Sequence, residues 1–562
     1  MLRSSGTAQA ESNRIQIRLT TASVTMARSM ASPRKPSWRS WRRSCAGSWV
    51  SAALLMAALW HAQNKRMSGC WLRLSGVNAV SETGGFFDGW VRNARLMDGR
   101  LVDLCVQAGE VVALGPALAP ATAKGLDAEG RALSPALVDH HLHLYAAAAA
   151  LDSLNCAPPQ IRCPADLHAA VASATPGGDG WIRAVAYHPS NGGEIDRATL
   201  DAWRPDVPVR VQHVSGRRWT LNSAGLEALG EDGPWQSEQD RANGHLLDQD
   251  SWLSARLRQR RGSRPPDLSR ISRTLASFGV VAVTDTGPTN NATTLAQLRA
   301  AVASGVVRQH IQMMGDASLD ALYVAAAVGR DRVAVGPHKF HLLESELPDF
   351  DWLCEAIGRS HAHQRPVAFH CVTRSELVFA LAALESVGVM VGDRIEHAGV
   401  CPDEQAQSIA RLGLWVVTQP EFVYSKGDRY LDEVAAEDQP WLYRLAGLRR
   451  AGVSLAASSD APYGALNPWQ GIAAAMQRRT RLGRCLGGDE ALALNDALSL
   501  YTGSLQAPGS AAPSFAVGCA ANLCVLDRSW AEIACSPAST QALLTLARGR
   551  IVWQGDQTGA LV

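Results

Sequence analysis

Two histidines at the end of a short apolar stretch are the first residues whose types and spacing suggest chemistry. Residues Leu133–Leu144 read Leu-Ser-Pro-Ala-Leu-Val-Asp-His-His-Leu-His-Leu. Alternate side chains of a strand share a face, so His141 and His143 are expected to point the same way. Because neutral imidazoles commonly bind zinc and related divalent metals, the pair predicts part of a metal site. Surface or packing histidines have the same spacing, so the pair alone does not decide the matter.

Four further candidate ligands lie farther along the chain, each within or just after an apolar segment. They are Lys339, His370, His397 and Asp460, in the segments His-Lys-Phe-His, Val-Ala-Phe-His-Cys-Val, Arg-Ile-Glu-His-Ala and Ala-Ser-Ser-Asp-Ala-Pro. Each has a structural explanation by itself: a lysine whose charge reaches the surface, a core histidine, or a helix N-cap. Their joint occurrence with the first pair favours one metal site that all of them share.

The segments that carry these residues alternate with amphipathic helical stretches, as expected for βα units on a parallel sheet. Eight strands are predicted, which suits a closed (β/α)8 barrel, if residues 155–269 form an insertion after the first strand. The predicted strands are Ala136–His143, Val280–Asp285, Gln309–Met314, His338–Leu343, Val367–Val372, Arg394–Ala398, Trp415–Gln419 and Val453–Asp460. Barrel enzymes carry their chemistry at the carboxyl ends of the strands, where the candidate ligands are expected to meet.

Short alternating strands at both ends of the chain predict a second, smaller structure. Three lie between residues 89 and 130, and Leu523–Asp527 and Leu543–Trp553 have the same character. Neither end can bury a sheet alone, so we expect one small β-sandwich built from both chain ends, beside the TIM-type α/β barrel. The expected organisation is an extension at 1–86, an N-terminal sandwich segment at 87–135, the barrel at 136–505 with its insertion at 155–269, and a C-terminal sandwich segment at 506–562.

Charge is distributed unevenly along the 562 residues. The first 66 hold eleven of the 54 basic residues but only one of the 52 acidic residues, Glu11, so the remainder carries a net charge of −8. An acidic body without a basic stripe argues against nucleic acid as a partner. A hydrophobic content of 47% and a charged content of 19% indicate a globular protein. A homodimer is the oligomeric state to expect on general grounds.

Residues 1–86 have no sustained apolar period and are expected to be disordered, or to result from a translation start placed too far upstream. The run Val50–Trp60 follows a basic stretch and imitates an export signal, but it lies too far from the first residue and no clean Ala-x-Ala site follows. It is also shorter than the about 20 apolar residues of a membrane span. We therefore expect a start at Met67 and a cytoplasmic protein, with export as the alternative.

From about residue 87 to 556 the chain resembles the amidohydrolase superfamily of metal-dependent hydrolases, and more narrowly its amidohydrolase-3 (YtcJ-like) branch. The resemblance rests on the candidate ligands, on Asn-Ser-Ala-Gly-Leu at Asn222–Leu226, and on the Arg-Ile-Glu-His-Ala and Ser-Asp-Ala-Pro segments. It implies a metal-bearing barrel flanked by a β-sandwich from both termini. It also implies one or two divalent ions, expected to be zinc, bound by His141, His143, Lys339, His370, His397 and Asp460.

In this superfamily the lysine is carboxylated, and elementary chemistry supports that modification. A free ammonium on Lys339 has no lone pair for a metal, whereas the carbamate formed with CO2 is an anion whose two oxygens can bridge two ions. His341 shares a face with Lys339, so a site that uses this imidazole instead, or a site with a single ion, stays open. Asp460 is the expected catalytic residue, because it would take the proton of the attacking water and pass it to the leaving nitrogen.

The resemblance implies that a metal-activated hydroxide hydrolyses a non-peptide carbon–nitrogen bond of a small molecule, such as an N-acyl, N-formyl or cyclic amide. A deaminase or an ester or lactone hydrolase would use the same site, and a single ion would favour the deaminase. A non-catalytic scaffold is a further alternative. Decay to a scaffold would be expected to remove ligands early, yet all of them are present.

Three further residues are candidates for contact with the substrate: Arg217, His341 and Gln419. Relatives commonly have Ser-Gly-His where this chain has Ser-Gly-Arg at 215–217. Arg217 therefore suggests either a preference for an acidic group or a solvated loop residue. Thr418 and Gln419, at the end of the predicted strand Trp415–Gln419, and Asp285, at the end of Val280–Asp285, are the next residues expected to face the pocket. They are expected to support the ligands or to pack more often than to take part in catalysis.

Overall fold

The computed structural model describes residues 85–230, 233–261, 265–328, 330–510 and 515–555. The predictions for the N-terminal extension up to residue 84, for its signal-like stretch and for a start at Met67 lie outside these residues. Across the described ranges, no helix combines the length and the apolar character that crossing a membrane requires.

Within the described residues, eight parallel strands form one sheet in the order β18-β17-β16-β15-β14-β13-β12-β6. The eight strands predicted from the sequence are confirmed, with ends that shift by a few residues. The strands are β6 (Leu137–Leu142), β12 (Val280–Asp285), β13 (His310–Gly315), β14 (Val333–His341), β15 (Val367–Cys371), β16 (Arg394–His397), β17 (Trp415–Thr418) and β18 (Ser454–Ala457). The sheet is that of a TIM-type barrel.

Backbone and side-chain hydrogen bonds join the two ends of this sheet. The amide of Asp460, in the loop after β18, donates to the carbonyl of His141 at 2.8 Å. The amide of His143 donates to the carbonyl of Ala461 at 2.9 Å. The Asp139 carboxylate on β6 accepts from the amide of Ser459 at 3.1 Å. The loop after the last strand is therefore fixed against the carboxyl end of the first strand.

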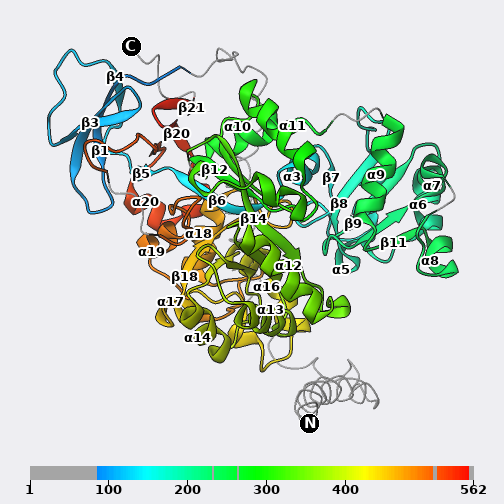
Figure 1. The fold of residues 1–562 in the computed structure, drawn as a ribbon. Coiled ribbons are helices and arrows are strands. Elements are labelled where there is room, and N and C mark those ends of the chain that lie inside the picture. The colour runs from blue at the N-terminus through cyan, green and yellow to red at the C-terminus, as the bar shows by residue number, and fades with distance from the viewer. Residues whose placement is uncertain (1–84, 231–232, 262–264, 329, 511–514, 556–562) are drawn as a thin grey trace, which may run out of the picture. The chain divides into compact units, whose positions relative to one another are not determined.

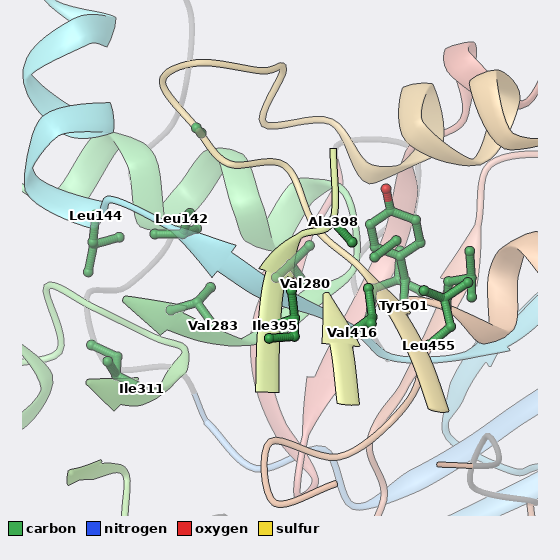
Figure 2. Close-up of a cluster of buried hydrophobic side chains, with 14 of the residues drawn as sticks. Leu142, Leu144, Val280, Val283, Ile311, Ile395, Ala398, Val416, Leu455 and Tyr501 are labelled. Atoms are coloured by element: carbon green, nitrogen blue, oxygen red, sulfur yellow. The ribbon is translucent and has the colours of Figure 1, made fainter. Parts of the chain in front are cut away.

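The barrel strands are apolar because both of their faces are buried. Figure 2 shows side chains of β6, β12, β16, β17 and β18 in the apolar core, with Val416 and Leu455 close to the ring of Tyr501. The rings of Phe340 and Phe369 stack with centroids 5.1 Å apart across β14 and β15. Ionisable side chains in such a sheet are costly unless they have partners, so those on β14 and β16 mark the place where function is expected.

Helices alternate with the barrel strands and pack against them and against one another. They include α10 (Ser269–Ser277), α11 (Ala292–Ala303), α12 (Phe350–Ala362), α13 (Arg374–Val387), α14 (Asp403–Leu412), α17 (Ala446–Arg450), α18 (Pro468–Gln477) and α19 (Leu494–Ser499). The start of α13 is fixed by a capping box, in which the Thr373 hydroxyl accepts from the Glu376 amide at 3.2 Å and the Glu376 carboxylate accepts from the Thr373 amide at 3.0 Å.

Strands from both ends of the described chain form two four-stranded sheets, which lie together in Figure 1. One contains β1 (Gly89–Arg95), β2 (Leu101–Gln107), β3 (Glu110–Gly115) and β4 (Gly125–Asp127), and the other β5 (Leu133–Pro135), β19 (Leu523–Leu526), β20 (Ala542–Ala547) and β21 (Arg550–Gln554). The predicted strand Leu543–Trp553 is in fact two strands, because Arg548 and Gly549 form a turn with positive φ. Apolar residues of both sheets share one core.

The segment after the first barrel strand folds on a sheet of its own. In this part of the described chain, five strands run in the order β11-β10-β9-β8-β7. They are β7 (Leu154–Asn155), β8 (Ile182–Tyr187), β9 (Val209–His213), β10 (Arg218–Leu221) and β11 (His245–Leu247), with α4 (Pro164–Ser173), α6 (Arg197–Trp203), α7 (Ser223–Leu229) and α9 (Asp250–Arg261) among the helices. Trp181 and Trp219 lie in an apolar cluster on which Trp235 and Trp252 pack, so these rings fill the interior.

Candidate metal centre

His141 and His143, at the carboxyl end of β6, meet Asp460 from the loop after β18. Nε2 of His141 lies 3.3 Å, and Nε2 of His143 3.4 Å, from Oδ1 of Asp460. The three possible ligand atoms lie within 4.8 Å of one another. This carboxylate oxygen is buried and has no hydrogen-bond partner within the described residues. A buried carboxylate oxygen that faces two imidazole nitrogens forms a site for a cation.

The charge of Asp460 is set by its neighbours. Burial acts to raise its pKa, but His141, His143 and His397 hold the pKa of Asp460 well below its usual range. Asp460 is therefore an ionised carboxylate, which can bind a metal and accept a proton.

Lys339 brings an amine to the same place from β14. Its side chain is 5% exposed, and its Nζ has no hydrogen-bond partner in the described part of the chain. Burial lowers the pKa of Lys339 to about 8, although the carboxylates of Glu396 and Asp460 act in the other direction. A lowered pKa increases the share of neutral amine, which is the form that carries a lone pair.

His370 and His397 complete the group of predicted ligands from β15 and β16. Their ring centroids are 4.5 Å apart, and that of His397 is 4.8 Å from the ring of His141. Burial lowers the pKa of His397 to about 3 and that of His370 well below its ordinary value. Both imidazoles are therefore neutral and offer a nitrogen lone pair, as metal ligands require.

Gln419, a predicted substrate contact, lies behind the ligands. Its side chain is fully buried, and its Oε1 accepts a hydrogen bond from Nδ1 of His397 at 2.8 Å. Because an amide oxygen only accepts, the proton of His397 is on Nδ1 and its Nε2 is free. Thr418 donates to the carbonyl of His397 at 2.8 Å. Both residues thus position His397.

A buried ion pair behind His141 was missed in the sequence. Glu396 forms a salt bridge with Arg394 and accepts a hydrogen bond from Nδ1 of His141, and the three side chains are at most 1% exposed. This bond fixes the tautomer of His141 and leaves its Nε2 for the contact with Asp460. The signal was present in Arg-Ile-Glu-His, where opposite charges occupy alternate positions of a buried strand.

The backbone of β16 also departs from the expected alternation. Since Arg394 and Glu396 share one face of the strand, His397 should point to the other. Instead His397 and Ala398 have φ values of 72° and 48°, in the left-handed region. Such a conformation costs about 1–3 kcal/mol at a residue with a Cβ. It accounts for the ring of His397 lying beside those of His141 and His370.

The other two predicted substrate contacts lie nearer the surface. The Arg217 guanidinium forms two hydrogen bonds with the Asp248 carboxylate, at 2.7 and 2.6 Å, so much of its charge is offset. His341 is exposed at the end of β14, and its ring centroid is 4.5 Å from that of His370. Asp285 is buried at the end of β12, where its carboxylate accepts from the Leu144 amide at 3.3 Å.

Gly216 connects the inserted sheet to the site. It lies between β9 and β10 with φ of 77°, and a Cβ built on it would be 2.6 Å from Cε1 of Tyr463. The Tyr463 ring in turn lies 5.6 Å from that of His143, edge to face. The loop at 215–217 therefore has room beside Tyr463 only because residue 216 has no side chain.

Gly216→Ala is expected to lower kcat/KM by about 10- to 100-fold, because the new methyl group displaces Tyr463 and a shift of about 1 Å beside a reacting centre has effects of this size. Gly180→Ala is the matched control, since Gly180 also has φ of 77° but nothing within 4 Å of the added Cβ. Steady-state kinetics on both variants would refute the role of the Tyr463 contact if the two lost activity equally.

The structure brings His141, His143, Lys339, His370, His397 and Asp460 to the same end of the barrel. Their donors are four imidazoles, of which those of His370 and His397 are neutral, an ionised carboxylate and a buried amine. Orphaned buried atoms on Asp460 and Lys339 lie among them. This donor set fits a divalent metal.

A TIM-type barrel with such a donor set at the carboxyl ends of its strands fits a metal-dependent hydrolase. The family model of the amidohydrolases (Amidohydro_3) matches residues 124–553, and the chain belongs to this amidohydrolase family. It is therefore a hydrolase that acts on carbon–nitrogen bonds other than peptide bonds.

Curated relatives agree with this assignment, and a solved structure agrees with the fold. The chain is 26% identical to an N-substituted formamide deformylase of Arthrobacter pascens over 512 residues, 78% of this chain and 92% of the relative. It is 26% identical to the putative amidohydrolase YtcJ of Bacillus subtilis (strain 168) over 162 residues, 28% of this chain and 31% of the relative. An uncharacterised metal-dependent hydrolase of Pyrococcus horikoshii OT3 has the same fold, with a TM-score of 0.61 and 21% identity over 78% of this chain and 97% of its own.

Proposed function

We propose that this amidohydrolase cleaves an N-substituted amide of a small molecule, with formamides as the first class to test, and that it uses two zinc ions and a carboxylated Lys339. The relative that acts on N-substituted formamides aligns with most of the chain and supports the substrate class. The single observation that carries the metal part is Lys339. Its amine is buried, has a lowered pKa, and has no hydrogen-bond partner among the described residues.

The chain's own residues have separate roles in this reaction. When bound, the ions would polarise the amide carbonyl and lower the pKa of a water molecule. The four histidines would hold them through imidazole nitrogens, and Lys339 through the oxygens of its carbamate. Asp460 takes a proton from the attacking water and delivers it to the leaving nitrogen, so that the amide and water become a carboxylic acid and an amine. Glu396 and Gln419 keep the rings of His141 and His397 in the required tautomers.

Zinc-loaded protein is expected to contain about two ions per chain, and Lys339→Ala at most about one, because the variant lacks the side chain whose carbamate would help to hold them. Inductively coupled plasma mass spectrometry measures the ions, and carbon-13 NMR after growth in labelled bicarbonate detects the carbamate carbon. Lys124→Ala, which removes an exposed lysine of the β-sandwich, is the matched control.

The same samples separate the alternatives. One ion per chain in both proteins, without a carbamate signal, would exclude the bridged centre and favour a deaminase, in which case ammonia would be released from ring amines. Formate and amine released from N-substituted formamides in equal amounts would support the proposed activity. Absence of bound metal after reconstitution would contradict the metal part.

A further inference from the structure

Lys426 places a second ammonium group near the metal centre, and neither the family resemblance nor the proposed mechanism accounts for it. It follows the short helix α15 (Glu421–Ser425), which comes directly after β17, and it precedes α16 (Gly427–Glu433). Its side chain is half-buried, and its Nζ lies 3.2 Å from the centroid of the Phe422 ring. A cation over an aromatic face is held in position by the quadrupole of the ring.

The Phe422 ring is itself fixed by its surroundings. It is 3% exposed and packs edge to face on Tyr443, with ring centroids 5.4 Å apart. The loop that carries Asp460 lies against it, since a Cβ built on Gly464 would be 2.9 Å from Cε1 of Phe422. The ammonium of Lys426 therefore has a defined position relative to the Asp460 loop.

The ammonium has no direct counterion. Within the described residues, no carboxylate oxygen lies within 4.0 Å of Nζ of Lys426. The carboxylates of Asp460 and Glu421 act on it from farther away, and the Arg429 guanidinium adds a like charge. Burial lowers the pKa of Lys426 to about 8. A half-buried cation without a paired anion is costly, so an anion supplied from outside would relieve the cost.

The two nearby carboxylates are already engaged. Oε2 of Glu421 accepts a hydrogen bond from the Ser425 hydroxyl at 2.8 Å. Oδ1 of Asp460 faces His141 and His143. Arg217, the arginine that the sequence suggested for an acidic group, is paired with Asp248. Lys426 is thus a cation near the site that is free to pair with a ligand.

We propose that Lys426, held over Phe422, forms a subsite for a carboxylate of the substrate, so that the preferred amides are N-formyl or N-acyl derivatives of amino acids or similar amino carboxylates. This inference rests on the proposed amide hydrolysis. An ammonium and a carboxylate form a charge-assisted hydrogen bond, which also orients the scissile amide toward Asp460. The Arg429 charge adds to the positive potential that attracts such a substrate.

The test compares two formamides that differ only in the carboxylate: N-formylphenylalanine and N-(2-phenylethyl)formamide. The metal-loaded enzyme is expected to prefer the first by about 10- to 100-fold in kcat/KM, the effect typical of a hydrogen bond between charged groups. In Lys426→Met this ratio is expected to fall to about one, mainly through KM for the carboxylate substrate, and Lys426→Arg should restore part of it. Arg411→Met, which removes an exposed cation on α14, is the control and should keep the full ratio.

The outcomes separate this proposal from the one on which it rests. The subsite is overturned if the native enzyme does not prefer the carboxylate substrate. It is also overturned if Lys426→Met leaves the ratio of the two kcat/KM values unchanged. If neither formamide is hydrolysed, calorimetric binding of both compounds decides: selective binding of N-formylphenylalanine that is lost in Lys426→Met supports the subsite while the proposed reaction fails. Equal or absent binding overturns the subsite as well.

Discussion

Asp460→Asn is expected to lower kcat/KM by about 10³- to 10⁴-fold, the largest effect on activity of any single change proposed for this chain. General acid–base catalysis by one residue is worth about 10²- to 10⁴-fold, and asparagine cannot carry the proton from the water to the leaving nitrogen. The change also replaces an anionic ligand with a neutral one. Because Oδ1 of Asp460 lies 3.3 and 3.4 Å from the nitrogens of His141 and His143, the metal content is expected to fall too.

Kinetics and metal analysis on the same preparation distinguish the two effects. A variant that keeps its metal but loses activity would assign Asp460 to proton transfer, whereas parallel losses would assign it mainly to metal binding. Asp98→Asn, the same substitution in an exposed turn beside Arg100, is the control. Retention of more than about a tenth of the native kcat/KM at full metal content would contradict the catalytic role of Asp460.

Glu396→Ala is expected to reduce the free energy of unfolding by about 3–5 kcal/mol, because it leaves the Arg394 guanidinium buried without its partner. The pair is at most 1% exposed, and the Arg394 guanidinium is otherwise bound to the carbonyl of His140, at 2.9 Å. The Nδ1 proton of His141 loses its acceptor in the same variant. The expected loss is large for one substitution, since most cost much less.

Denaturant unfolding with the metal removed by a chelator measures this effect without a contribution from metal binding. The double variant Arg394→Met with Glu396→Leu should regain much of the stability, because apolar residues of similar size can replace a buried ion pair. Its His141 ring would still lack an acceptor, so its metal affinity should stay reduced by about 10- to 100-fold. If Glu396→Ala had the same free energy of unfolding as the native protein, the ion pair of Arg394 and Glu396 would have no structural role.

The barrel could be predicted from the sequence because its strands are apolar runs, most of which carry a polar residue at or near the carboxyl end. That pattern gave the eight strands and the residues that meet there. Alternation gave His141 and His143, which share a face of β6. Alternation does not hold at His397, because the backbone there is left-handed. For this reason the contact of Glu396 with His141 was missed in the sequence.

Contacts between segments far apart in the chain could not be predicted. Nothing in the spacing links Arg217 to Asp248 or Gln419 to His397, since these pairs depend on where loops and strand ends meet. Lys426 belongs to no sequence motif, and its proposed role follows only from its position over Phe422 and near the Asp460 loop. Regular elements follow local patterns, whereas specificity depends on loops placed by the whole fold.

The hydrogen bonds between the Asp460 loop and β6 make metal binding part of how the barrel closes. His141 and His143 belong to the first strand and Asp460 follows the last, and the bond between Asp139 and Ser459 spans 320 positions of the chain. An ion held by these three residues would link the first strand of the barrel to the loop after its last strand. Its binding free energy would therefore stabilise the closed barrel as a whole and not only one loop. A nascent chain would not have all three of these residues until both strands had been made.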